Sequence, residues 1–495
     1  MLFTSAEFIL VFLPLVFLVY FWLNHRRQTQ AGKSWLVLAS LFFYGWWNPA
    51  YVPLILLSMG INFGVGAVLS AAAPAGRQRV PVLLAGIVFN LGLLAYFKYA
   101  GFLVANIDRL FGAAIPVPEI ALPLAISFFS FTQIAYLVDC HRGEVKDRDP
   151  LNYALFVSFF PHLIAGPIVH HKAIISQFAS ARNLVRHYPN IVLGLFIFTL
   201  GLFKKVVVAD SFALWATTGF DQAPALNFFE AWFTSLAYTF QIYFDFSGYT
   251  DMAIGASLLF NIRLPINFNS PYKALDIRDF WRRWHITLSQ FLRDYLYVPL
   301  GGNRARPARI YTNLFVTFAL GGLWHGASWM FVIWGASHGA AIVLHRLWRQ
   351  WGRKSGRRMP ALLAWFITFN FVNLTWVFFR AKGWDDAMKV MKGMAGLNGV
   401  ILPQAARDGL GFLQGWGIHF GAWIERIGGD ATTVPWLAAA LILALAFRNS
   451  NELFFAPDSK RFIGPGWATA IAVIASVSIL LSWASTYTEF IYFNF

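Results

Sequence analysis

Histidine is the side chain of this sequence best suited to acid–base or nucleophilic chemistry near neutral pH. His325 lies in the string Gly321-Gly-Leu-Trp-His-Gly-Ala327, between two apolar stretches. An ionisable residue in such a context indicates a functional site, because an apolar medium penalises charge. The neighbouring glycines permit close approach of a backbone or a substrate. The alternative interpretation is a histidine hydrogen-bonded to a neighbouring carbonyl.

A second candidate region, residues 261–310, interrupts the apolar pattern with nine Lys or Arg and three Asp. Within it, apolar side chains recur every three or four residues, which predicts an amphipathic helix on or partly inside a membrane surface. These side chains are Phe280, Trp284, Leu288, Phe291 and Tyr295. The same segment carries His285, which lies 40 residues before His325 (325 − 285 = 40).

The arginines of this region allow two interpretations. They can anchor the helix at a membrane interface with their charges in water. They can also form a basic entrance for an anionic donor such as a nucleotide or phosphopantetheine phosphate. The candidates for such donor contacts are Arg282, Arg283 and Arg304.

Other polar residues in apolar surroundings have structural explanations. Asp245 and Asp251 need partners, and we expect arginines of residues 261–310 to supply them. His162 lies in the stretch 151–168, which contains Pro161, Gly166 and Pro167 and therefore predicts a broken or re-entrant segment. His162 either belongs to this break or has a role in a tunnel for the donor. His338 and His345 follow His325 without an intervening acidic residue or an HExxH arrangement, so we expect no metal.

Composition defines the elements that must position these residues. Hydrophobic residues make up 58% and charged residues 13%, against roughly 45–50% and roughly 25% in soluble domains. Lys and Arg number 39 and Asp and Glu 23, so the net charge is +16. A soluble fold would lack the polar surface to cover itself, and one cysteine, Cys140, forms no internal disulfide. The chain is therefore predicted to be an all-α polytopic integral membrane protein.

About 11 transmembrane helices are expected, since about 20 apolar residues cross a bilayer. The candidate spans include two separate ones at Phe228–Phe244 and Met252–Leu264. Basic residues in loop 24–34 and in 346–358 place both in the cytoplasm by the positive-inside rule. The turn 46–51 and the acidic stretch 210–230 are then outside. Residues 385–430 form either a peripheral loop or short amphipathic helices.

Several strings together resemble the membrane-bound O-acyltransferase (MBOAT) family, most closely its bacterial alginate-acetylating branch. The resemblance runs in consistent order from the first span to about residue 380. The matching strings are Leu41-Phe-Phe-Tyr-Gly-Trp-Trp47, Tyr96-Phe-Lys-Tyr99, Phe160-Pro-His-Leu-Ile-Ala-Gly-Pro167, Gln241-Ile-Tyr-Phe-Asp-Phe-Ser-Gly-Tyr249, Phe280-Trp-Arg-Arg-Trp-His-Ile286, Leu292-Arg-Asp-Tyr-Leu-Tyr297, Gly301-Gly-Asn-Arg304 and Gly321-Gly-Leu-Trp-His-Gly-Ala327.

The resemblance implies one membrane domain over residues 1–495, with core motifs at 34–380 and less diagnostic helices at 385–495. Its helices would surround a central tunnel, with re-entrant or interfacial helices beside it. It places the family's invariant histidine on His325 and its more variable polar position on His285, with Trp324 shaping the pocket. His325 would either activate the acceptor hydroxyl or carry the acyl group itself.

The resemblance further implies an O-acetyltransferase of the bacterial inner membrane without a permanently bound cofactor. Acetyl-CoA would be the cytoplasmic donor, and a periplasmic acetyltransferase partner or the polysaccharide itself, such as alginate, the acceptor. D-alanyl transfer to a cell-wall polymer remains an alternative within the family. A polysaccharide-associated transporter without chemistry is an alternative from another class, because broken helices and polar residues at membrane depth also mark transporters.

Overall fold

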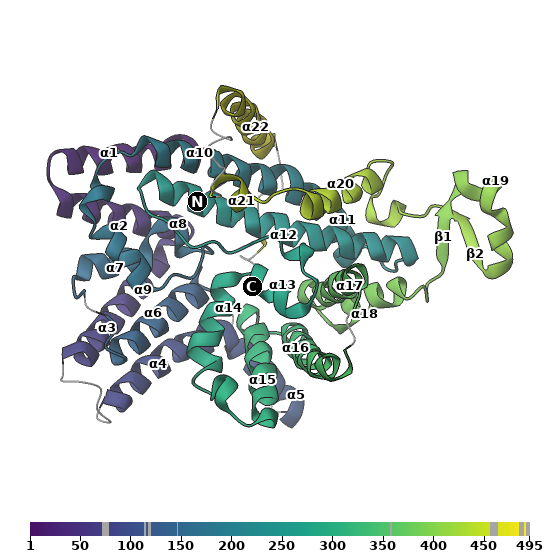
Figure 1. Cartoon of the computed structure of the whole chain (residues 1–495), viewed down its shortest axis with the longest axis horizontal. Helices are drawn as coiled ribbons and strands as arrows, with labels where there is room; N and C mark the ends of the chain where they lie inside the picture. Colours follow the sequence, from purple (N-terminus) through teal and green to yellow (C-terminus); the bar gives the residue numbers. More distant parts are fainter. Residues whose placement is uncertain are drawn as a thin grey trace.

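Helices form almost all of the computed structural model, which describes residues 1–71, 79–112, 115–116, 120–145, 147–356, 359–455, 464–484 and 490–491. Figure 1 shows the first helices gathered on one side and the central part of the chain across the middle, while the last helix, α22 (Pro465–Ala484), packs against α10 (Tyr188–Phe203). Beyond the bundle, a small arm that contains β1 and β2 projects sideways. The all-α fold of the prediction is confirmed.

In the described part of the chain, seven helical segments are long and apolar enough to cross a membrane. They are Glu7–His25, Pro49–Ala71, Val80–Phe111, Tyr188–Gln222, Trp329–Gly352, Ala361–Arg380 and Pro465–Ala484. Four other long helices join the bundle: α2 (Thr29–Gly45), α6 (Ile126–His141), α12 (Phe228–Leu259) and α15 (Pro307–His325). The protein is a multi-pass membrane protein, and the exact number of spans stays a prediction.

The central helix α12 packs closely along α10 (Tyr188–Phe203), as Figure 1 shows. A Cβ atom on Gly201 would lie 2.5 Å from the Gly248 carbonyl oxygen, so the two backbones touch where both residues are glycine. The prediction of two spans at 228–244 and 252–264 is wrong, because α12 is one helix of 32 residues. The intervening polar string stays helical because its carboxylates find partners inside the bundle.

Lysines, not arginines, neutralise these carboxylates. Lys204 Nζ lies 2.6 Å from Asp251 Oδ2, and Lys205 Nζ lies 2.8 Å from Asp245 Oδ1. Lys205 also contacts Asp210 at 2.6 Å. Both lysines come from a π-helical turn, η6 (Lys204–Ala209), that continues α10. The expectation that arginines of residues 261–310 pair with Asp245 and Asp251 is therefore wrong.

The stretch 151–168 is broken, as predicted. It forms α7 (Pro150–Ser158), the single turn α8 (Phe160–Leu163) and an irregular segment before α9 (His171–Phe178). His162 is buried in α8. The irregular backbone is covered by protein, and the Ile168 N–H donates to Thr287 Oγ1 at 3.0 Å. This covering is what a bilayer requires of non-helical backbone.

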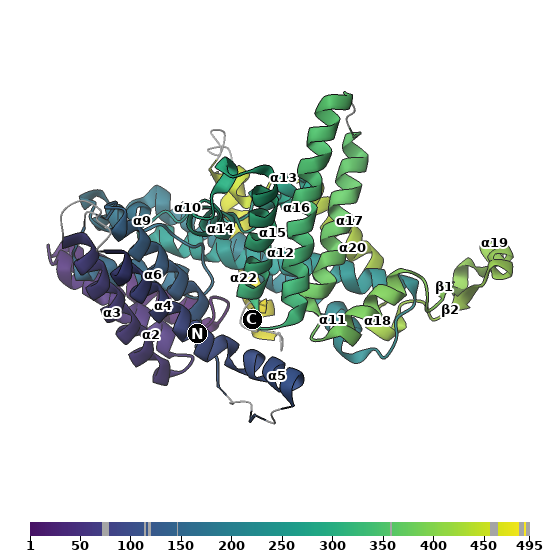
Figure 2. The same cartoon turned by 90° about the horizontal axis from the view of Figure 1, so that it is seen from below.

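The second half of the chain contains a long helical hairpin. In Figure 2, α16 (Trp329–Ser355) and α17 (Ala361–Arg380) run side by side as a long pair. Most of the basic segment 346–358 forms the C-terminal end of α16, and Arg357 and Arg358 lie outside the described residues. Further helices of the described chain include α1 (Leu13–His25), α3 (Val52–Ala71), α4 (Val80–Leu94), α5 (Ala100–Phe111), α11 (Asp210–Thr217), α20 (Thr433–Ala446), α21 (Ser450–Phe454) and α22 (Pro465–Ala484).

Residues 385–430 combine an amphipathic helix with the projecting arm. Helix α18 (Trp384–Met394) packs on α12, and Gly393 meets Ala231 closely. The strands β1 (Val400–Pro403) and β2 (Ile418–Gly421) pair in parallel, with Val400 opposite Ile418. Between them lies the single turn α19 (Arg407–Leu410). Neither strand was expected from the sequence.

Candidate active site

His325 is the last residue of α15 and is only 3% exposed. One side of this helix end is held by α16, because a Cβ atom on Gly322 would overlap the Phe331 carbonyl oxygen. The chain then leaves the helix at Gly326 in an extended conformation. The glycines that the sequence singled out thus bring two helices together beside the histidine.

His285 lies in a tight turn between α13 (Ile277–Arg283) and α14 (Ile286–Leu292). The prediction of one continuous interfacial helix across residues 280–295 is wrong, because His285 has φ +43° and ψ +54°. This left-handed conformation costs a non-glycine residue about 1–2 kcal/mol. The two short helices turn their apolar residues into the protein, and His285 is completely buried.

Asn267 holds this strained turn in place. Its Oδ1 lies 3.3 Å from His285 Nδ1 and accepts from Thr287 N at 3.2 Å and Thr287 Oγ1 at 3.0 Å. Its backbone carbonyl accepts from the Ile286 N–H at 3.0 Å. Because the amide oxygen is an acceptor, it favours the tautomer of His285 with the proton on Nδ1.

The structure brings the two predicted histidines together. Their ring centroids are 6.2 Å apart, although 40 residues separate them in the chain (325 − 285 = 40). The rings of Trp324, Trp334 and Phe379 stand 5.0–5.2 Å from His325. Trp324 is 5% exposed, and its Nε1 has no hydrogen-bond acceptor among the described residues. A buried indole N–H beside two histidines is a donor available to a bound carbonyl group.

A pocket reaches His325 from the side predicted to face outward. It is lined by Trp47, Lys98, Leu122, Pro123, Leu124, Ala125, Ile126, Ser127, Phe128, Ile164, Trp324 and His325. Trp47 belongs to the outer turn, and residues 122–128 lie at the same end, in the segment that leads into α6 and in its first turn. Ile164 belongs to the broken segment, so this irregular stretch also contributes to the pocket wall.

The predicted arginines are not equivalent. Arg283 donates to Asp279 Oδ2 at 3.0 Å and to the Asn269 carbonyl at 3.3 Å, so it fastens α13 to the loop before it. Arg282 and Arg304 are exposed. Partial burial, and then the positive charges of Arg282 and Arg349, lower the pKa of Arg278. Adjacent cations of this kind favour an anion, and contact with a donor phosphate stays a prediction for Arg282 and Arg304.

His338, in contrast, is engaged on both ring nitrogens. Trp281 Nε1 donates to His338 Nδ1 at 3.2 Å, and Thr375 Oγ1 lies 3.0 Å from His338 Nε2. His345 lies 3.6 Å from Asp276. Within the described ranges, no three His, Cys, Asp or Glu residues are grouped so that they could hold a metal ion.

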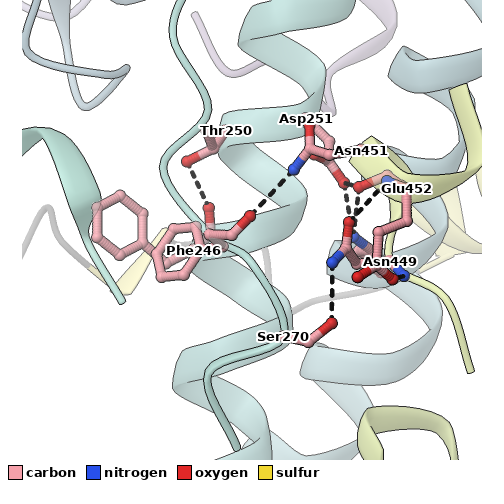
Figure 3. Close-up of polar contacts among 10 residues, drawn as sticks. Phe246, Thr250, Asp251, Ser270, Asn449, Asn451 and Glu452 are labelled. Atoms are coloured by element: carbon pink, nitrogen blue, oxygen red, sulfur yellow. Dashed lines mark hydrogen bonds and ion pairs between the residues drawn. The ribbon is translucent and has the colours of Figure 1, made fainter. Parts of the chain in front are cut away.

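Sequence reasoning missed the C-terminal support of the site. Asn449 donates to Asn269 Oδ1 at 2.9 Å and to Ser270 Oγ at 2.8 Å, and Asn451 donates to the Phe268 carbonyl at 3.0 Å. Figure 3 shows Asn449 and Asn451 at the start of α21, with Ser270 and the α12 residue Asp251 beside them. These hydrogen bonds fix the loop that carries Asn267, so α21 supports His285 indirectly, through Asn267. The run Asn449-Ser-Asn-Glu452, which forms a capping box, is the signal that marks this short helix.

Both histidines lie inside a stretch that matches a known protein family. The model of MBOAT, the membrane-bound O-acyltransferase family, matches residues 84–383. The chain belongs to the membrane-bound O-acyltransferase family. It is therefore an acyltransferase, and residues 285 and 325 are its candidate catalytic histidines.

Relatives of this membrane-bound O-acyltransferase carry related names. It is 46% identical to the peptidoglycan O-acetyltransferase of Helicobacter pylori, over 100% of this chain and 98% of that protein. It is 36% identical to the probable alginate O-acetylase AlgI of Pseudomonas aeruginosa, over 100% of both chains. Identity to the teichoic acid D-alanyltransferase of Bacillus subtilis is 26%, over 59% of this chain and 81% of that protein.

Proposed function

We propose that the protein moves an acetyl group from a cytoplasmic thioester donor, acetyl-CoA, to a hydroxyl acceptor at the outer face of the bacterial inner membrane. The observation that carries this proposal is the buried pair His285 and His325, of which His325 lines a pocket on the side predicted to face outward. Relatives named O-acetyltransferase and O-acetylase over the full chain length support acetyl as the group.

His325 acts as the general base in this proposal. It accepts the proton of the acceptor hydroxyl as the oxygen bonds to the thioester carbonyl carbon. The C–S bond then breaks, and the departing thiolate takes this proton from the imidazolium of His325. Negative charge develops on the carbonyl oxygen, and the indole N–H of Trp324 is a donor suited to stabilise it. His285, held by Asn267, orients the thioester.

The donor enters from the end of the molecule that carries the arginines. Arg282 and Arg304 are exposed there and can hold its phosphates, whereas Arg283 is already paired with Asp279. No permanently bound cofactor is needed, because the thioester itself supplies the activated acyl group.

Peptidoglycan is the first candidate for the final acceptor, since the identity to the Helicobacter pylori enzyme is 46%. An alginate-like exopolysaccharide is the second, on the 36% identity to the Pseudomonas aeruginosa protein. In either case a periplasmic acetyltransferase partner can receive the group first. D-alanyl transfer has the weaker support of 26% identity over 59% of the chain.

Radiolabelled acetyl-CoA tests the proposal on purified protein in nanodiscs. We expect the wild type to consume the donor and transfer label to peptidoglycan fragments or a periplasmic partner, and His325→Ala to do neither. His345→Ala is the matched control, because His345 pairs with Asp276 and does not line the pocket. If the wild type consumes a carrier-protein thioester but no acetyl-CoA, acetyl-CoA is not the donor. If label transfer survives in His325→Ala, His325 is not the general base.

A further inference from the structure

The end of α15 is capped by two residues from a distant helix. The last carbonyl groups of any α-helix have no partner within the helix. Here the Tyr99 hydroxyl donates to the Leu323 carbonyl at 2.8 Å. Lys98 Nζ donates to the Trp324 carbonyl at 2.6 Å and to the His325 carbonyl at 3.1 Å. Two adjacent side chains thus take three consecutive carbonyls, and the last belongs to the candidate base.

The helix that supplies these residues is locally distorted. Lys98 and Tyr99 end a π-helical turn, η4 (Ala95–Tyr99), inside the span Val80–Phe111. Single π-helical turns are rare and occur frequently at functional sites. The distortion changes the direction in which the following side chains point, and here both point to the end of α15.

The ammonium group of Lys98 is fully used. Its third contact is Ser127 Oγ at 3.1 Å, so three N–H donors meet three acceptors. It therefore has no N–H left for a substrate. Within the described residues no carboxylate lies within 4.0 Å of Nζ. The negative ends of the carbonyl dipoles stabilise the ammonium charge instead. A cation at a helix C-terminus is electrostatically favourable.

We propose that Lys98 and Tyr99 are positioning residues that clamp the end of α15 and hold His325 in its reactive place. The inference rests on the proposed function, because it assigns the base role to His325. On one side the clamp fixes the backbone carbonyls of 323–325, and on the other Gly322 packs against α16. His325 is thus held from two directions while its ring reaches the pocket.

Lys98→Ala tests the clamp in the acetyl-CoA assay. We expect kcat to fall about 100-fold, the effect of displacing a catalytic group by about 1 Å. The KM for acetyl-CoA should stay within about twofold, because Lys98 contacts no donor group. Propylammonium should restore at least about tenfold of the lost activity, since it replaces the deleted atoms and reaches the site through the pocket. A merely destabilised protein would not respond to it.

Propyltrimethylammonium is the matched control for this rescue, because it carries the same charge without an N–H donor. Rescue by both cations would show that charge alone matters and would overturn the clamp. The clamp would also be overturned if Lys98→Ala kept the kcat of the wild type. A folded Lys98→Ala protein whose lost activity neither cation restores would overturn it too.

Tyr99→Phe keeps the test decisive if Lys98→Ala does not fold. Removal of one hydroxyl should lower kcat about fivefold. Tyr272→Phe is its control, because it removes a comparable hydroxyl-to-carbonyl bond, on Thr239 of α12 at 2.6 Å. Equal losses in both variants would overturn the clamp. An inactive wild type would instead refute the proposed function.

Discussion

Two buried histidines of this protein have nearly the same surroundings and different bonding. His325 and His338 are 3% and 0% exposed, and Trp334 lies against both rings, at 5.2 and 4.9 Å. His338 is in the middle of α16 and joins Trp281 to Thr375 through its two nitrogens. His325 ends α15 at the wall of a pocket. Burial among aromatic rings therefore does not mark the active site, whereas a helix end open to a pocket does.

The bonding of His338 fixes its protonation. The Thr375 hydroxyl donates to the Val372 carbonyl at 2.9 Å, so it accepts from His338 Nε2–H. His338 Nδ1 then accepts from Trp281. Such a neutral histidine cannot take up a proton without losing a hydrogen bond. From this comparison we expect substitutions of His325 to reduce activity and substitutions of His338 to reduce stability.

His325→Ala should have the largest effect. Removal of a general base typically costs about 10²- to 10⁴-fold in rate. The thermal midpoint should stay near that of the wild type, because the ring leaves a cavity beside an existing pocket. Turnover and thermal unfolding measured on the same preparation check both statements. A large drop in the midpoint with a small drop in kcat would make His325 resemble His338.

Asn267→Ala should come next. It removes the acceptor that His285 Nδ1 and Thr287 share, so the left-handed turn loses its support. We expect kcat to fall about 30-fold through displacement of His285. Ser270→Ala, which removes one acceptor of Asn449 in the same loop, is the control. Equal losses would show that the loop acts as a whole rather than through His285.

The site was predictable where chemistry leaves a mark in the chain. His325 and Trp324 stand out because polar groups and glycines interrupt an apolar run, and the structure brings His285 to them. The roles of Asn267, Lys98 and Tyr99 were not predicted, although the string Tyr96-Phe-Lys-Tyr99 was noted, because each acts through a contact with a residue distant in sequence. For Lys98 that separation is 227 residues.

The fold was predictable to the level of apolar spans. Hydropathy located most helices, yet it divided α12, because it counts Asp245 and Asp251 as polar without their lysine partners. It also joined α13 to α14, because the three-to-four spacing of apolar residues continues across the turn at His285. Contacts between separate elements of the bundle decide whether α12 continues and whether α13 ends at the turn. A short window along the sequence does not contain these contacts.

Trp324→Phe should have an intermediate effect. It keeps an aromatic ring against Phe131, whose centroid is 5.2 Å away, and removes only the indole N–H. If this donor stabilises the carbonyl oxygen, kcat should fall about tenfold to 100-fold while KM changes little. Trp376→Phe is the control, because it also removes a buried indole N–H but lies outside the pocket lining. An equal kcat for Trp324→Phe and the wild type would remove Trp324 from the chemistry.

Arg282→Ala should act on binding alone. An exposed arginine that contacts a donor phosphate contributes equally to the ground state and the transition state, so KM should rise about fivefold with kcat unchanged. The effect should shrink with added salt because the contact is screened. Arg309→Ala, another exposed arginine of the same region, is the control. A KM for acetyl-CoA that is insensitive to Arg282 would place the phosphates elsewhere.

His338→Leu should have the smallest effect on chemistry and a clear one on stability. It leaves the Trp281 indole N–H and the Thr375 hydroxyl without their partner, at a cost of about 1–3 kcal/mol for each unsatisfied group. The thermal midpoint should therefore fall, while kcat for each folded molecule stays within about threefold of the wild type. His338→Gln, which keeps one donor and one acceptor, should recover part of the midpoint. If kcat collapsed in both variants with the midpoint intact, His338 would belong to the reaction, and a pocket wall would no longer separate a catalytic histidine from a structural one.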